Sequence, residues 1–280
     1  MAKQKTSGAA RSGKRRPPTM AERADRMVLY ERAVHDPATE VDFLQRAFRD
    51  ARKRLPRSFR EDFSGAASAA CEWARRGPQR RAIGVDIEPA VLEWGRRKRL
   101  SRLTPAARRR VSLVNADVLT VRTRPVEVIA ALNFSYWVFK EREQLLRYFR
   151  NAHAGLTRDG ILVLDAFGGY EACREMRERT EHRGFTYVWH QARYQPVTGH
   201  LLCHIHFRFP DGSRMDRAFS YDWRLWTLPE LREILLQAGF RRVTVYWEGD
   251  DGEGGGNGEF SPSTTGEADG GWIAYVVAEK

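Results

Sequence analysis

Apolar positions recur along the chain with two different periods, and the changes between them divide it into predicted strands and helices. Short apolar runs indicate buried strands, and longer stretches with apolar residues every three to four positions indicate helices. The strand-like runs cover residues 58–62, 82–85, 111–118, 126–132, 161–165, 242–247 and 272–277. The helical patterns between them cover residues 69–76, 89–100, 141–156 and 229–237. Alternating strands and helices predict an α/β fold with a mostly parallel sheet flanked by helices.

The N-terminal part carries a helical pattern of its own. It starts at about Met20, breaks at His35-Asp36-Pro37 and continues to Lys53. We therefore predict N-terminal helices over residues 21–54. Tyr30 lies in the seam of the first helix, where it either covers a ligand or simply packs.

Residues 168–226 interrupt the alternation. Strand-like runs at 185–194, 200–209 and 214–223 are separated by turns, one of them Pro210-Asp211-Gly212. They predict a three-stranded antiparallel insert, which a helix over residues 170–182 precedes. Further on, Thr227 and Glu230 form a predicted capping box, and the acid- and glycine-rich residues 249–271 predict a long loop.

The positive charge of the chain points to nucleic acid as a candidate partner. The formal net charge is +12, and much of the excess lies in residues 1–26, of which 1–20 are expected to be disordered. Such a basic tail can bind nucleic acid or remain solvated. No run approaches the about 20 apolar residues of a membrane span, and the basic start lacks the apolar core of a secretory signal. Cys71, Cys173 and Cys203 predict reduced thiols in a cytoplasmic protein.

The segment from 58 to 88 predicts a strand, a tight turn of small residues, a helix and a second strand that ends at Asp86. Such a unit presents backbone N–H groups at the start of its helix, and an acid at the tip of its second strand. Asp86 follows Gly65 by 21 residues, close to the spacing of about 20 for an acid that binds ribose hydroxyls. The segment thus predicts a nucleoside site.

This segment resembles the first two motifs of class I S-adenosylmethionine-dependent methyltransferases, in which an acid precedes three alternating glycines. Glu61 takes the position of the acid and Gly65 that of the middle glycine, while Phe63 and Ala67 replace the other two. An alternative register makes Asp62 the acid. The later strands match the family in order. The resemblance implies a Rossmann-like, seven-stranded, mostly parallel sheet with one reversed strand.

The resemblance also implies S-adenosylmethionine as the cofactor. Gly65 then lies under its methionine part, Asp86 binds ribose, Asp117 binds adenine, and Glu61 approaches the amino group. The other implied cofactor contacts are Ala67, Ile87, which packs on adenine, Val118 and Asn133.

The acceptor residues follow from the same resemblance. Asn133 and Tyr136 occupy the family's acceptor-facing position after the fourth strand, with packing as the alternative for Tyr136. Phe134 and Ser135 stand where DNA-type base methylases have two prolines, which argues against that activity.

The insert lies where enzymes resembling glycine N-methyltransferase close over their substrate. The candidate substrate residues are Tyr30, His190, Tyr221 and Trp223. His190 or Tyr221 is a candidate general base, while packing between insert and sheet is the alternative for the aromatic residues. Strand alternation puts His200, His204 and His206 beside Arg208 on one face, for which we expect solvent and no metal.

The resemblance implies a methyltransferase acting on a small or medium-sized acceptor. The expected parts are a basic tail (1–20), a helical lid (21–54), a cofactor-binding core (55–167), a substrate insert (168–226) and the end of the core (227–280). An RNA or ribosomal-protein methyltransferase that uses the basic tail is one alternative. A non-catalytic cofactor-binding or regulatory protein of the same fold is the other.

Overall fold

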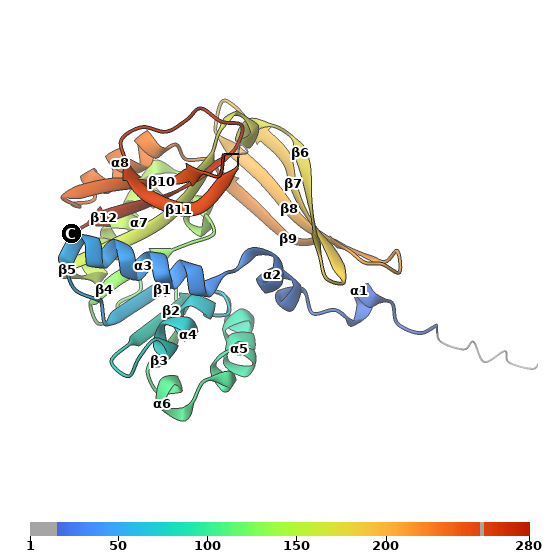
Figure 1. Cartoon of the computed structure of the whole chain (residues 1–280), viewed down its shortest axis with the longest axis horizontal. Helices are drawn as coiled ribbons and strands as arrows, with labels where there is room; N and C mark the ends of the chain where they lie inside the picture. Colours follow the sequence, from blue (N-terminus) through green and yellow to red (C-terminus); the bar gives the residue numbers. More distant parts are fainter. Residues whose placement is uncertain (1–15, 253–254) are drawn as a thin grey trace, which may run out of the picture.

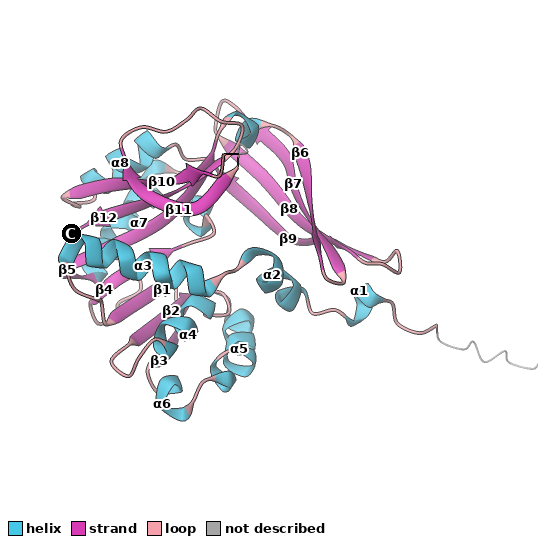
Figure 2. Ribbon diagram, in the orientation of Figure 1, coloured by secondary structure: helices cyan, strands magenta, loops and turns pink. Residues whose placement is uncertain are grey.

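The computed structural model describes residues 16–252 and 255–280, so most of the predicted basic tail lies outside the described residues. Within them the chain forms two β-sheets with helices around the larger one (Figures 1 and 2). The larger sheet has the strand order β11-β10-β12-β5-β4-β1-β2-β3, and the smaller has the order β6-β7-β8-β9. The strands are β1 Ser58–Asp62, β2 Arg81–Asp86, β3 Val111–Asn115, β4 Val126–Ala131, β5 Leu156–Gly168, β6 Met176–His182, β7 Phe185–Gln195, β8 His200–Arg208, β9 Arg214–Arg224, β10 Arg242–Asp250, β11 Gly256–Ser263 and β12 Trp272–Glu279.

The larger sheet is parallel from β3 to β5, and β12 reverses the direction beside β5. In the described residues it has eight strands and not the seven that we predicted. The additional strand, β11, comes from the region predicted to be a loop and pairs antiparallel with β10. The polar, glycine-rich sequence of β11 has no alternation of apolar residues. An exposed edge strand does not need one, because backbone pairing with its neighbour holds it in place.

Helices cover both faces of this sheet. The residues of β4 show why, since Val128 packs into the core under α3 and α4, and Ile129 into the core under α7 and α8. The predicted capping box of α8 is confirmed, with Thr227 and Glu230 exchanging hydrogen bonds. The helices are α1 Met20–Arg23, α2 Arg26–Val34, α3 Pro37–Arg52, α4 Ser68–Arg75, α5 Pro89–Lys98, α6 Pro105–Arg108, α7 Arg142–Gly155 and α8 Leu228–Gln237, with short 3₁₀ turns at Leu100–Arg102, Ser135–Val138 and Tyr170–Cys173.

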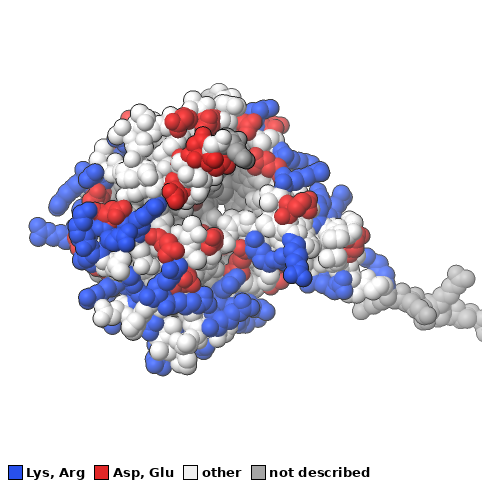
Figure 3. Space-filling model, viewed as in Figure 1, with Lys and Arg blue, Asp and Glu red and all other residues white. Residues whose placement is uncertain are grey.

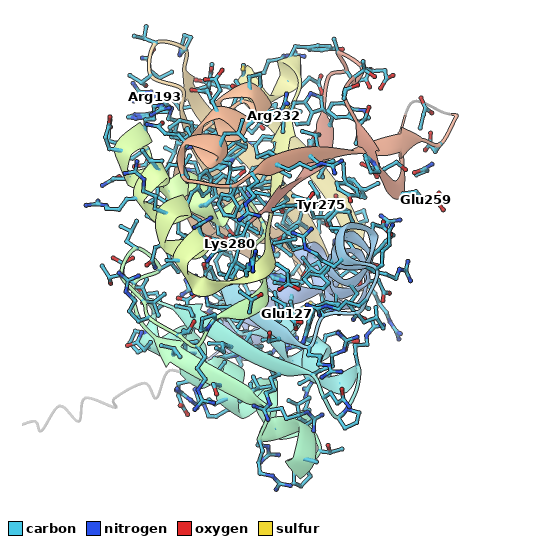
Figure 4. All side chains as sticks on the ribbon, turned by 90° about the vertical axis from the view of Figure 1, so that its left-hand side faces the viewer. Glu127, Arg193, Arg232, Glu259, Tyr275 and Lys280 are labelled. Carbon is cyan, nitrogen blue, oxygen red and sulfur yellow. The ribbon has the colours of Figure 1, made fainter. Side chains whose placement is uncertain are left out.

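The amino ends of the parallel strands lie on the side of the molecule that Figure 4 shows, where Glu127 and Lys280 are labelled. Glu127 accepts hydrogen bonds from the backbone N–H groups of Arg57 and Ser58, and the Lys280 ammonium donates to the carbonyls of His153 and Leu156. These contacts tie the amino ends together. In open α/β sheets ligands bind at the opposite, carboxyl ends of the strands.

The smaller sheet has four strands in the described residues instead of three. Residues 176–182 form β6 and not the predicted helix. Their mixed charges suit an exposed helix as well as an edge strand, and pairing with β7 decides between the two.

Helices α1 and α2 connect the smaller sheet with the core. The Arg26 guanidinium donates to the carbonyl of Ala218 in β9 at 3.2 Å. At the other end of α2, the buried Glu31 pairs with Arg99 and accepts a hydrogen bond from the Ser68 hydroxyl at 2.9 Å. Among the described helices, none is long and apolar enough to cross a membrane.

Candidate functional site

The turn after β1 holds three residues in the left-handed backbone region. Phe63, Gly65 and Ala67 have φ values of 56°, 51° and 59°, at the positions where the methyltransferase motif has glycine. Glycine adopts this conformation most readily, so Phe63 and Ala67 hold a backbone conformation that favours glycine. The Phe63 ring packs against Phe139 and Tyr148 and so turns into the core. Ala67 is fully buried in this turn, and the cofactor contact implied for it stays a prediction.

Asp86 ends β2 directly opposite this turn. Its Oδ2 accepts the N–H of Gly65 at 2.7 Å, and its Oδ1 accepts the N–H of Glu88 at 2.9 Å. These bonds fix the carboxylate and leave lone pairs for further donors, because an ionised carboxylate offers about four acceptor positions. The geometry suits hydroxyl donors of a ribose.

Three further acidic residues are called the acid set below: Glu61 of β1, Glu40 of α3 and Asp165 of β5. Burial raises the pKa of Glu61 to about 8. The N–H of Ala70 donates to its carboxylate at 2.8 Å, and this hydrogen bond lowers the pKa by a smaller amount. Burial likewise raises the pKa of Glu40 in α3 to about 8, and that of Asp165 in β5 to about 7. The charges interact, since Asp165 raises the pKa of Glu40, and Glu40 raises that of Glu61.

This acid set has no cationic partner at neutral pH in the part of the chain that is described. The nearest base is His35, whose Nδ1 lies 3.9 Å from Glu40, but burial lowers its pKa to about 4. Asp62, the alternative acid of the motif, is instead fully buried in an ion pair with Arg60. The structure therefore favours the register with Glu61 and leaves its carboxyl group available to a cationic ligand.

Asp117 and Ile87 lie at the tips of β3 and β2. The Oδ1 of Asp117 accepts the N–H of Leu119 at 2.8 Å, and Ile87 is 63% exposed. The side chain of Val118 is buried in the core, and the cofactor contact implied for this residue stays a prediction. Asn115, which we had not singled out, donates from Nδ2 to the carbonyls of Asp86 and Ile87 and fixes the tip of β2.

The loop after β4 is held by Asp165. Asn133 and Phe134 have φ values of 57° and 56°, and their N–H groups donate to Oδ2 and Oδ1 of Asp165 at 2.6 and 2.9 Å. Asn133 thus stands between the acid set and the second sheet. Tyr136 is fully buried, and its hydroxyl donates to the Asp165 carbonyl at 2.8 Å. Its predicted role in orienting an acceptor is wrong, and packing is its role.

A cavity of about 460 Å³, called the chamber below, lies between this loop and the inner face of the smaller sheet. Figure 3 shows a hollow near the middle of this side of the molecule, with acidic side chains around it. Of the predicted substrate residues, Tyr30, Tyr221 and Trp223 line the chamber. A larger groove of about 950 Å³ between α8, β10 and residues 262–268 adjoins it at Trp272 and does not reach the acid set.

His190 does not belong to the chamber. Strand alternation turns it to the outer face of the smaller sheet, where its Nδ1 lies 3.3 Å from Nε2 of His206. Its predicted contact with substrate, and its candidacy as general base, are therefore wrong. His204 and His206 are 6% exposed, so the expectation of a solvated face was wrong for them. In the described residues no group of His, Cys, Asp or Glu is placed to hold a metal ion.

Tyr221, the other candidate base, shares a hydrogen bond with Tyr30. Burial raises the pKa of Tyr221 far above its usual value, and that of Tyr30 to about 12. Both hydroxyls stay protonated at neutral pH. Tyr221 is the donor in its hydrogen bond with Tyr30, and neither hydroxyl can act as a base toward a bound molecule.

The chain is similar to known proteins in its structure and not in its sequence. No protein-family model matches the sequence, and no curated protein matches it significantly. Among solved structures, an S-adenosylmethionine-dependent methyltransferase from Clostridium acetobutylicum is 14% identical, with a TM-score of 0.66 over 90% of this chain and 96% of that one. The sugar N-methyltransferase KedS8 from Streptoalloteichus is 18% identical, with a TM-score of 0.62 over 100% and 98%.

A third similar structure is CalS10 with bound S-adenosylmethionine, an amino pentose methyltransferase from Micromonospora echinaspora. It is 16% identical, with a TM-score of 0.64 over 90% of this chain and 95% of that one. The chain therefore has the fold of S-adenosylmethionine-dependent methyltransferases, and the predicted Rossmann-like fold class is confirmed. The likeness of the insert to that of glycine N-methyltransferase stays a prediction.

Proposed function

We propose that this protein is an S-adenosylmethionine-dependent methyltransferase that acts on a small or medium-sized acceptor in the chamber. The acid set, formed by Glu61 of β1, Asp165 of β5 and Glu40 of α3, carries this proposal. Glu40, Glu61 and Asp165 lie inside the protein without a cationic partner among the described residues. Ionised carboxylates in such a place are costly unless a cation compensates them, and S-adenosylmethionine carries a sulfonium and an ammonium group.

The other site residues fit the rest of that molecule. The carboxylate of Asp86 accepts hydrogen bonds from the ribose hydroxyls, and that of Asp117 accepts one from the adenine amino group. The exposed side chain of Ile87 packs on the adenine ring, and the turn at Gly65 leaves room for the methionine part. Glu61 approaches the amino group, as the resemblance implies.

The cofactor brings an activated methyl group, so the protein needs no nucleophile of its own. Its task is to hold the acceptor in line with that group and to exclude water. Asn133, fixed by Asp165, lies at the border between the acid set and the chamber and orients the acceptor. Two of the structural relatives are named as methyltransferases of sugars, and a cavity of about 460 Å³ is of the usual size for a small-molecule site.

Calorimetric titration with S-adenosylmethionine and S-adenosylhomocysteine tests this function. We expect micromolar binding that Asp86→Ala weakens more than tenfold, because hydrogen bonds to a charged group are worth about 1.5–3 kcal/mol each. Asp86→Asn keeps an acceptor for the Gly65 N–H and separates loss of ligand from loss of fold.

Glu88→Ala is the matched control, since Glu88 is exposed and its side chain caps nothing. Failure of the wild-type protein to bind either compound would refute the proposal. Binding without turnover of any small acceptor would favour the non-catalytic alternative. Turnover of RNA or ribosomal protein that depends on residues 1–20 would favour the other.

A further inference from the structure

The chamber is lined largely by aromatic side chains, which come from both sheets, from α2 and from the loop after β4. They are Tyr30, Phe134, Phe167, Tyr187, Trp189, Tyr221, Trp223 and Trp272. The rings of Tyr221 and Trp223 stack with their centroids 4.5 Å apart, and Trp189 lies 6.2 Å from each of them. Such a wall offers an apolar surface and the negative faces of several rings.

The charged residues of this lining are all acidic. Glu171, Glu178 and Glu248 line the chamber, and no Lys or Arg is found among its described lining residues. This contrasts with the whole chain, whose net charge is +12. In Figure 3, too, acidic side chains gather around the hollow, while many of the basic ones lie farther out.

Two of these three acids have no ion-pair partner among the described residues. Glu248 accepts only the backbone N–H of Gly258, at 2.9 Å, and Glu178 projects from β6 without an ion pair. Glu171 pairs with Arg174 at 3.2 Å. Negative charge at the chamber therefore remains uncompensated by the protein.

From this lining we infer that the acceptor is an amine, held as an ammonium ion on an apolar body by the aromatic rings and glutamates of the chamber. The inference rests on the proposed function. Aromatic faces and carboxylates both attract cations, while anionic acceptors such as nucleic acid phosphates would meet repulsion.

The transfer step balances with this acceptor. The bound ammonium loses one proton to water, and the lone pair of the neutral amine forms the new C–N bond. The S–CH₃ bond breaks with its electron pair moving to sulfur, which leaves S-adenosylhomocysteine and an N-methylated ammonium. The product carries the same charge as the bound substrate, so the chamber holds it by the same contacts.

The test uses three ring compounds of nearly equal size: cyclohexylamine, cyclohexanol and cyclohexanecarboxylate. Each is titrated calorimetrically into the full-length protein at pH 7, with and without S-adenosylhomocysteine. We expect the amine to bind at least tenfold more tightly than the alcohol, and the carboxylate most weakly. Added salt should weaken amine binding and leave alcohol binding unchanged.

A variant with both Glu178→Gln and Glu248→Gln should weaken amine binding about three- to tenfold, the range for two partly exposed charges. The control carries Glu175→Gln and Glu259→Gln, two exposed glutamates outside the chamber lining, and should bind like the wild type. Equal affinity for amine and alcohol, no amine binding at millimolar concentration, or equal loss in both variants would overturn the inference.

These outcomes are distinct from failure of the proposed function. A protein that binds the amine but neither S-adenosylmethionine nor S-adenosylhomocysteine would refute the methyltransferase proposal alone. One that binds S-adenosylhomocysteine but prefers the alcohol would refute the amine alone.

Discussion

Glu61 couples the ligand site to the stability of the fold. Its pKa is raised from 4.5 to about 8 by burial, so between these values the folded protein holds a proton that the unfolded chain has released. The contribution of Glu61 to stability is therefore greatest below about pH 4.5 and is lost as the pH rises to about 8, by roughly 1 kcal/mol per pH unit. Glu40 acts in the same direction.

We predict that Glu61→Gln makes the ligand-free protein more stable than the wild type at pH 8 and nearly equal to it at pH 4.5. The amide oxygen can still accept the Ala70 N–H and carries no buried charge. Urea unfolding at several pH values measures the difference. Glu259→Gln, an exposed change on β11 (Figure 4), serves as control. Parallel curves for wild type and Glu61→Gln would contradict the prediction.

At the scale of elements, α5 lies directly against the turn that carries Gly65. A Cβ atom on Gly95 would lie 2.6 Å from the carbonyl oxygen of Ala66, closer than van der Waals contact allows. This neighbour is backbone, so it cannot turn away as a side chain would. The close approach of helix and turn therefore depends on glycine at this position.

We predict that Gly95→Ala lowers the free energy of unfolding by about 1–3 kcal/mol, the usual cost of overpacking. Helix propensity alone predicts the opposite sign, a gain of about 1 kcal/mol, so the experiment decides between the two effects. Arg97→Ala, an exposed change on the same helix, is the control. Chemical denaturation gives the stabilities, and weaker binding of S-adenosylhomocysteine by Gly95→Ala would show that the turn has moved.

Across the whole molecule, sequence patterns predicted those features that depend on residues close together in the chain. The strands and helices of the core follow from apolar runs, and Asp86 from its place at the end of one. The elements β6 and β11 were missed because each is an edge strand whose structure comes from its neighbour. The prediction placed His190 in a strand, as observed, but on the wrong face of the smaller sheet. Neighbouring residues of a strand point to opposite faces, so an error of one position reverses the face.

The missed site residues depend on long-range packing. Asp165 was visible as an acid at the end of an apolar run, although nothing local shows that it holds Asn133 and Phe134. Glu40 gave no signal at all, because its pKa depends on how α3 lies on the sheet. Sequence patterns thus predicted the edge that bears the site, and only the fold could assemble the acid set.

The N-terminal helices connect the smaller sheet with the core, and the buried carboxylate of Glu31 makes the contact of α2 with the core. Its carboxylate pairs with Arg99, the residue that follows α5, and accepts a hydrogen bond from the Ser68 hydroxyl, so both ligand regions depend on α2. We predict that Glu31→Gln loosens α2, because breaking a buried pair leaves Arg99 uncompensated at a cost of about 3 kcal/mol.

Hydrogen exchange of residues 26–34 should then be faster, and affinity for amines in the chamber should fall several-fold because Tyr30 is displaced with α2. Glu93→Gln is the matched control. Glu93 also pairs with arginines of α5, but at an exposed site where an ion pair is worth at most about 1 kcal/mol. Equal exchange rates in the two variants would show that α2 is held by apolar contacts alone, and the Glu31–Arg99 pair would then have no part in ordering the chamber.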